Sequence, residues 1–129
     1  MNTTLLVALS FAAVLVAGCA STNKAGSPGV LRHVVLFKFK ADAKPEQIRH
    51  VEEEFRALKS RIPGVQDLEW GTNVSPEGLN QDFTHCFFVT FADAKARDAY
   101  LPHAAHQDFV KILKPILDKV LVVDYVAKD

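Results

Sequence analysis

The sequence predicts one domain of the α+β class, with a single four-stranded antiparallel sheet and helices on one face. Two observations carry this prediction. Segments rich in β-branched and aromatic residues alternate with segments whose apolar residues recur at helical spacing, in the order strand, helix, strand, strand, helices, strand. Residues 31–129 hold all of these segments, and that length suits one hydrophobic core.

The first expected strand and the first expected helix follow each other directly. Residues 31–40 are dominated by β-branched and aromatic side chains and are expected to form a strand. Pro45 can open a helix, because its missing N–H costs nothing there, and Pro63-Gly64 ends it. One face of this helix is apolar, with Ile48, Val51, Phe55, Leu58 and Ile62 at helical spacing.

The rest of the domain is expected to contain three strands and two helical segments. Asp93 can cap the first of these helical segments, and Pro102 interrupts the chain before the second. The expected elements are strands over 65–72, 83–91 and 120–126, helical segments over 93–100 and 103–112, and a loop over 73–82.

The order of these elements is the βαββαβ pattern of a ferredoxin-like fold. Helices can cover only one face of such a sheet, and the other face would expose apolar residues of all four strands. We therefore expect a homodimer in which two sheets pack face to face about a two-fold axis, as a dimeric α/β barrel.

Residues 1–18 are interpreted as a lipoprotein signal peptide. Residues 5–17 are apolar or small apart from Ser10, and this run is too short to span a bilayer. It leads into Val16-Ala17-Gly18-Cys19, which matches the lipobox of bacterial lipoproteins, where the cysteine is lipidated. The residues before the run carry no Lys or Arg, which departs from the usual signal peptide.

Residues 19–30 are interpreted as the lipidated Cys19 and a flexible tether rich in Ser, Thr, Asn, Gly and Pro. The lipid would anchor the protein without spanning the membrane. In bacterial lipoproteins an aspartate directly after the lipidated cysteine favours retention in the inner membrane, and this sequence has Ala20 there. We therefore expect the protein to be anchored on the periplasmic side of the bacterial outer membrane.

The composition excludes several classes of function. The formal net charge is zero and no basic stripe is visible, so nucleic acid is not an expected partner. Cys86 is the one cysteine of the domain, which leaves neither an internal disulfide nor a zinc motif of paired cysteines.

Histidines are the main candidates for chemistry. Four of the five histidines fall in or beside predicted core elements, and only His50 falls on a wet helix face. Imidazole changes charge near neutral pH and serves as acid, base or ligand. The candidate site residues are His33, His85, Tyr100, His103 and His106, which we expect to line one pocket between the sheet and the helix near His103, although each histidine can also be a structural core residue.

Five short motifs together resemble the stress-responsive dimeric α/β barrel (Dabb) family, over residues 31 to about 128. They are His33 to Lys40, Trp70-Gly71, Thr84-His85 leading into Val89-Thr90-Phe91, Tyr100 to His106, and Val123-Asp124-Tyr125. The resemblance implies a ferredoxin-like fold and a homodimer. One departure lies inside the fourth motif, where Ala104 stands in place of the family's proline.

The resemblance also implies roles for the site residues. A plant polyketide cyclase of this family closes its substrate by an intramolecular aldol reaction, and its catalytic tyrosine and histidine match Tyr100 and His106. His33, His85 and His103 would then bind substrate. An aldol closure needs a base for a carbon-bound proton and a donor for the enolate oxygen, and it needs neither metal nor organic cofactor.

Three functions remain open from the sequence. The first is cofactor-free acid–base chemistry on a small hydrophobic carbonyl compound. The second is a stress-related module that binds such a ligand without turnover. The third is a haem- or metal-binding barrel, because His103 and His106 are three residues apart, as two ligands on one helix can be. It is the weakest of the three, because no carboxylate lies at matching spacing.

Overall fold

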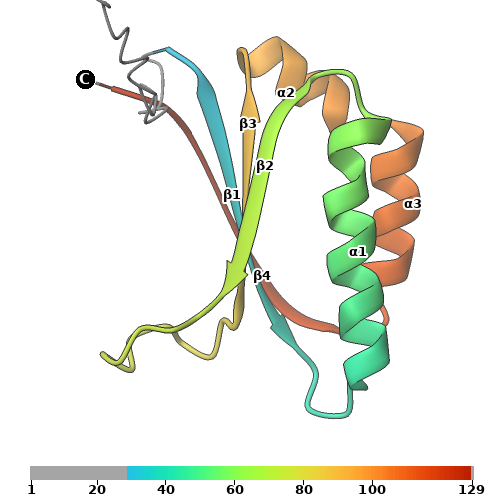
Figure 1. Ribbon diagram of the computed structural model, residues 1–129, viewed down its shortest axis with the longest axis vertical. Helices are drawn as coiled ribbons and strands as arrows, with labels where there is room; N and C mark the ends of the chain where they lie inside the picture. Colours follow the sequence, from blue (N-terminus) through green and yellow to red (C-terminus); the bar gives the residue numbers. More distant parts are fainter. Residues whose placement is uncertain (1–28, 129) are drawn as a thin grey trace, which may run out of the picture.

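The computed structural model describes residues 29–128 and shows a ferredoxin-like α+β fold with one antiparallel sheet beside three helices (Figure 1). The predicted signal peptide, Cys19 and most of the tether lie outside the described residues. Within residues 29–128, no helix is long and apolar enough to cross a bilayer. The elements are β1 (Leu31–Phe39), α1 (Pro45–Arg61), β2 (Val65–Thr72), β3 (His85–Phe91), α2 (Ala94–Tyr100), α3 (Ala104–Leu113) and β4 (Leu117–Val126).

The sheet has the strand order β2-β3-β1-β4, and all three pairings are antiparallel. The helices lie on one side of it, with α1 and α3 next to each other, and no helix of residues 29–128 lies on the opposite face (Figure 1). The predicted arrangement of the sheet and helices is therefore confirmed. Both central strands, β1 and β3, pack against the helices through every second residue.

The core lies between this sheet face and α1, α2 and α3. Alternate residues of β1 and β3 point toward the helices and are buried, as a period of two requires. Phe55 of α1 stacks on Phe87 of β3 with ring centroids 4.1 Å apart, and Phe37 packs beside both. Aromatic packing of this kind fixes the height of α1 above the sheet.

Local sequence explains where α1 begins and ends. Pro45 occupies the start of the helix, and the backbone N–H of Lys44 donates to Oε1 of Gln47 at 3.0 Å. The chain leaves the helix at Ile62, directly before Pro63, because a residue that precedes proline disfavours the helical conformation. The buried face of α1 includes Val51, Phe55 and Leu58, as the periodicity predicts.

Two boundaries differ from the sequence prediction. Strand β3 begins at His85 and not at residue 83, because Gln81 and Asp82 have φ angles of 47° and 64° and turn the chain just before it. Strand β4 begins three residues before the expected residue 120, because Leu117 pairs with Phe39 across an irregularity in the register.

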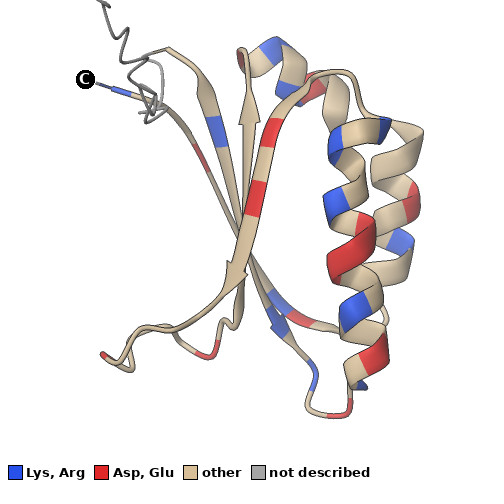
Figure 2. Ribbon diagram, in the orientation of Figure 1, with Lys and Arg blue, Asp and Glu red and all other residues tan. Residues whose placement is uncertain are grey.

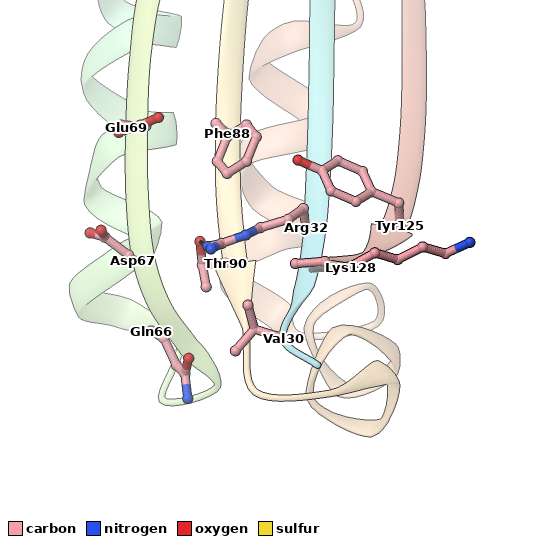
Figure 3. A pocket seen from close by; sticks show the side chains of 10 residues that line it. Val30, Arg32, Gln66, Asp67, Glu69, Phe88, Thr90, Tyr125 and Lys128 are labelled. Carbon is pink, nitrogen blue, oxygen red and sulfur yellow. Dashed lines mark hydrogen bonds between the residues drawn. The ribbon is translucent and has the colours of Figure 1, made fainter. Parts of the chain in front are cut away.

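The face of the sheet away from the helices is open. A groove of about 550 Å³ crosses it, and Figure 3 shows side chains of four strands on this face with the helices behind them. Arg32 lies there over the ring of Phe88 and donates to the hydroxyl of Thr90. Asp67 and Glu69 of β2 line this groove, and α1 carries both signs of charge along its length (Figure 2).

Strand β4 is one of the two edge strands of the sheet, and its apolar side chains are exposed on both of its faces. Exposed fractions run from 45% at Leu121 to 53% at Val126. Such a strand is unusual in an isolated protein, since exposed apolar edges favour association.

Candidate functional site

Three of the predicted site residues form one cluster at the end of the sheet where α2 meets α3. The ring centroid of Tyr100, at the end of α2, lies 4.4 Å from the ring centroid of His106 in α3 and 5.9 Å from that of His33 in β1. Tyr100 is fully buried, His33 is buried, and His106 is half-buried at the edge of the group. We call these three residues the His33–Tyr100–His106 cluster.

The break between α2 and α3 positions His106. The chain leaves α2 at Leu101-Pro102 and begins α3 at Ala104, after His103 as its N-cap. The carbonyl oxygen of Leu101 accepts from Nδ1 of His106 at 2.9 Å and from Nε2 of Gln107 at 2.7 Å. A carbonyl oxygen only accepts, so the proton of the neutral His106 ring is on Nδ1 and the lone pair is on Nε2.

His33 is held by a carboxylate that comes from β4. Nδ1 of His33 lies 2.6 Å from Oδ1 of Asp124, and Oδ2 of Asp124 accepts from the guanidinium group of Arg97 in α2. The register of β1 and β4 places His33 directly opposite Asp124. A carboxylate partner puts the proton of the neutral ring on Nδ1, so Nε2 carries the lone pair here too.

Both histidines of the cluster are neutral at pH 7. Burial and the positive charge of Arg97 lower the pKa of His33 from 6.5 to about 4. The Asp124 carboxylate attracts a proton, but Arg97 offsets its charge. Burial lowers the pKa of His106, the Leu101 carbonyl partly opposes this, and His33 lowers it further.

The hydroxyl group of Tyr100 is buried and has no hydrogen-bond partner among residues 29–128. Burial raises the pKa of this phenol well above its usual value, so it stays protonated and keeps its donor. Buried polar groups are nearly always hydrogen-bonded, and a rare exception asks for an explanation. The cluster therefore combines one unused donor with two neutral imidazoles.

His85 does not join this cluster, although it was expected to line the same pocket. Its side chain points to the helix side of the sheet, as parity requires, but it pairs with Phe37, whereas His33 pairs with Val89. Four residues along β1 separate the two positions, which is roughly 13 Å. His85 contacts Glu52, Thr84 and the rings of Phe39 and Trp70 instead.

His103 also has a different surrounding from the one expected. Its Nδ1 accepts the backbone N–H of Ala105 at 3.2 Å and so caps α3. This contact stabilises the helix that carries His106. In the part of the chain that the structure describes, no group of three or more His, Cys, Asp or Glu side chains is placed to hold a metal ion.

Sequence reasoning missed two residues of the site, Arg97 and Asp124. Nothing in the local sequence of Arg97 separates it from surface charges. A signal was available for Asp124, because it is the single acidic residue within the apolar run 120–126. Its partner His33 is 91 residues away, so only the strand register could join them.

Comparison with known proteins identifies relatives over nearly the whole described domain. Stress-response A/B barrel domain-containing protein HS1 of Arabidopsis thaliana is 39% identical over 97 residues, which are 75% of this chain and 89% of that protein. Olivetolic acid cyclase of Cannabis sativa is 26% identical over 98 residues, which are 76% of this chain and 97% of the cyclase.

Solved structures share the fold. A dimeric protein of unknown function and ferredoxin-like fold from Bacteroides fragilis superposes with a TM-score of 0.63 at 26% identity, covering 77% of this chain and 97% of that one.

The sequence profile named Stress responsive A/B Barrel Domain matches residues 31–127. The chain therefore belongs to the stress-responsive A/B barrel (Dabb) family.

Proposed function

We propose that the His33–Tyr100–His106 cluster binds a small hydrophobic carbonyl compound and carries out cofactor-free acid–base chemistry on it. The observation that carries this proposal is the buried Tyr100 hydroxyl, which has no partner among the described residues and lies beside the ring of a neutral histidine. A ligand oxygen that accepts from this hydroxyl would supply the missing hydrogen bond. The likeness to olivetolic acid cyclase supports the same class of chemistry.

The proposed reaction divides between the two groups. Nε2 of His106 takes a proton from a carbon next to a carbonyl group, and the hydroxyl of Tyr100 donates to the resulting enolate oxygen. In an aldol step the enolate carbon then attacks a second carbonyl carbon, and His106 returns its proton to the new alkoxide. His33, fixed by Asp124, offers Nε2 as an acceptor to the bound ligand.

The surroundings of the cluster suit an apolar ligand. Phe91 lies 5.1 Å from the Tyr100 ring and Phe109 lies 6.4 Å from the His106 ring, measured between centroids. Arg97 and Asp124 pair with each other, so the cluster offers no free charge to an ionic ligand. An uncharged ketone with an alkyl chain matches this environment best.

Deuterium exchange tests the proposal directly. Nonane-2,4-dione in D₂O exchanges its carbon-bound protons through an enolate, and NMR follows the loss of the signal. The protein should accelerate this exchange, and His106→Gln, which keeps a donor for the Leu101 carbonyl, should remove about 10²–10⁴ of the acceleration. His50→Gln, at an exposed histidine, serves as the matched control.

The outcomes separate the alternatives. Binding of the diketone without faster exchange would favour a ligand-binding module and contradict turnover. Unfolding of His106→Gln together with unchanged diketone affinity in the folded fraction would make His106 a structural residue.

We also propose that the chain forms a homodimer through its open sheet face and β4. The exposed apolar side chains of β4 and the dimeric relatives support this. Light scattering on the protein from Ser21 onward should give twice the monomer mass. A monomer at micromolar concentration would contradict the proposal.

Lipid anchoring through Cys19 on the periplasmic side of the outer membrane is a separate proposal, supported by the lipobox in the sequence. The full chain should enter the detergent phase on phase partitioning, and Cys19→Ala should stay in the aqueous phase. A wild-type chain with intact first residues in the aqueous phase would contradict it.

A further inference from the structure

We propose that Thr84, His85 and Glu52 form a second, separate site, in which the hydroxyl of Thr84 acts as a nucleophile toward small uncharged esters. The three side chains are linked in a row. Oγ1 of Thr84 lies 2.8 Å from Nδ1 of His85, and Nε2 of His85 lies 2.9 Å from Oε1 of Glu52. A nucleophile, a base and a group that orients the base, each within hydrogen-bond reach, are the arrangement of a catalytic triad.

The partners fix the direction of each hydrogen bond. The carboxylate of Glu52 only accepts, so Nε2 of His85 carries a proton and donates it. In the neutral ring Nδ1 then has the lone pair, and it accepts the hydroxyl proton of Thr84. The distance from Thr84 Oγ1 to the alternative acceptor, the carbonyl oxygen of Phe37, is 3.5 Å, so His85 is the better partner.

Burial divides the row in the way that such chemistry needs. The side chain of His85 is only 8% exposed and is shielded from solvent, whereas Thr84 is exposed, so a substrate can reach its hydroxyl. Glu52 projects from α1 with a side chain 19% exposed, so its contact with His85 is screened from water on most sides. The rings of Phe39 and Trp70 hold the imidazole of His85 in place.

A hollow of about 670 Å³ lies in front of Thr84 and His85. Phe39 and Ile48 give it an apolar wall that suits a short acyl chain. The ammonium group of Lys38 lines the same hollow, and Asp82 and Asp118 lie 3.1 Å and 3.4 Å from it. An ammonium group has three N–H bonds, so a third remains for the oxygen that develops negative charge. Lysines and aspartates balance in this lining, which favours an uncharged substrate.

The proposed reaction is ester hydrolysis in two steps. Oγ1 of Thr84 attacks the acyl carbon while its proton passes to Nδ1 of His85, and the ester C–O bond breaks as His85 returns the proton to the departing alcohol. Water then attacks the acyl-Thr84 ester, its proton passes through His85 to Oγ1, and the carboxylic acid leaves. Glu52 is a positioning residue, because it acts only through His85.

Hydrolysis of p-nitrophenyl butyrate by the full chain tests this inference. Thr84→Val and His85→Gln should each lower kcat/KM by about 10²–10⁴, and the double variant should lose no more than either single variant, since residues that act as a unit are not additive. Thr84→Ser should retain activity. Glu52→Gln should lower kcat and leave KM unchanged.

Covalent labelling identifies the nucleophile independently. A fluorophosphonate should add once per chain, with loss of fluoride, and peptide mass spectrometry should place the adduct on Thr84. Thr72→Val, at an exposed threonine of β2, should hydrolyse and label like the wild type. His50→Gln, at an exposed histidine of α1, should also leave both readouts unchanged, which separates the role of His85 from a general effect of imidazole.

Either of two results would overturn the inference. One is a Thr84→Val variant that is folded by circular dichroism and hydrolyses the ester at the wild-type rate. The other is an adduct that maps to a lysine or to another histidine while Thr84 stays unmodified.

Discussion

Replacing Tyr100 by phenylalanine should stabilise the protein while removing its proposed activity. The hydroxyl of Tyr100 is buried without a partner among the described residues, and a buried unsatisfied polar group costs about 1–3 kcal/mol. Phenylalanine keeps the ring contacts with His33, Phe91 and His106 and deletes only the hydroxyl. We expect the free energy of unfolding to rise by about 1 kcal/mol or more.

Urea denaturation at a fixed protein concentration measures this change. The single tryptophan, Trp70, is half-buried against Phe87 and His85, and its fluorescence should report unfolding. A gain of 1 kcal/mol corresponds to a rise in Tm of roughly 4–8 °C for a domain of this size. The slope m should stay the same, since both chains bury the same surface.

Thr72→Val is the control, because it also removes a hydroxyl group, at an exposed residue of β2 that lies away from the proposed dimer face. Its free energy of unfolding should change by less than about 0.5 kcal/mol. Tyr100→Phe should also abolish the faster deuterium exchange of nonane-2,4-dione, because the donor to the enolate is gone. Destabilisation of Tyr100→Phe by 1 kcal/mol or more would show that the hydroxyl has a native partner and is not available to donate to a ligand.

Three further predictions concern stability. The pKa of His33 is 6.5 in the unfolded state and about 4 in the folded state, so between these pH values the unfolded state binds a proton that the folded state does not. The free energy of unfolding should therefore rise by up to about 3 kcal/mol between pH 4 and pH 6.5. His33→Asn should flatten that part of the pH curve, and a wild-type curve that falls with pH would mean a charged imidazole. Phe87→Ala should cost about 3–5 kcal/mol in urea titrations, because Phe87 is fully buried and stacks on Phe55. Asp93→Ala should cost about 1 kcal/mol, because its carboxylate caps α2 by accepting from the Ala96 N–H at 2.9 Å, and a cost near zero would contradict this role.

Sequence patterns predicted the fold well because alternation and helical periodicity report directly which face of an element is buried. The helix stripe that includes Val51, Phe55 and Leu58 is the buried face of α1 in the structure. The boundaries of β3 and β4 were less accurate. They depend on the left-handed turn at residues 81–82 and on pairing across the irregularity at Lys38, neither of which has a periodic signal.

The candidate site was predictable in part for the same reason. Parity placed His33 and His85 on the helix side of the sheet, which the structure confirms. The alternation of side chains tells which face of the sheet a residue is on but not its position along the strand. It could not show that His85 pairs with Phe37, four residues along β1 from His33. The pairing of Arg97 with Asp124 depends on long-range packing, so the local sequence could mark Asp124 as unusual but could not name its partner.

The register of β4 has a chemical consequence for His33. In an antiparallel pair a slip of one residue turns every side chain to the opposite face. If β4 slipped by one position against β1, Val123 or Tyr125 would stand opposite His33, and the Asp124 carboxylate would face the open side of the sheet. The imidazole would then lose the group that keeps its proton on Nδ1. The turn that leads into β4 at Leu117 thus determines which ring nitrogen of His33 is basic. A single residue inserted there would change the protonation of the cluster while His33, Tyr100 and His106 themselves stayed the same.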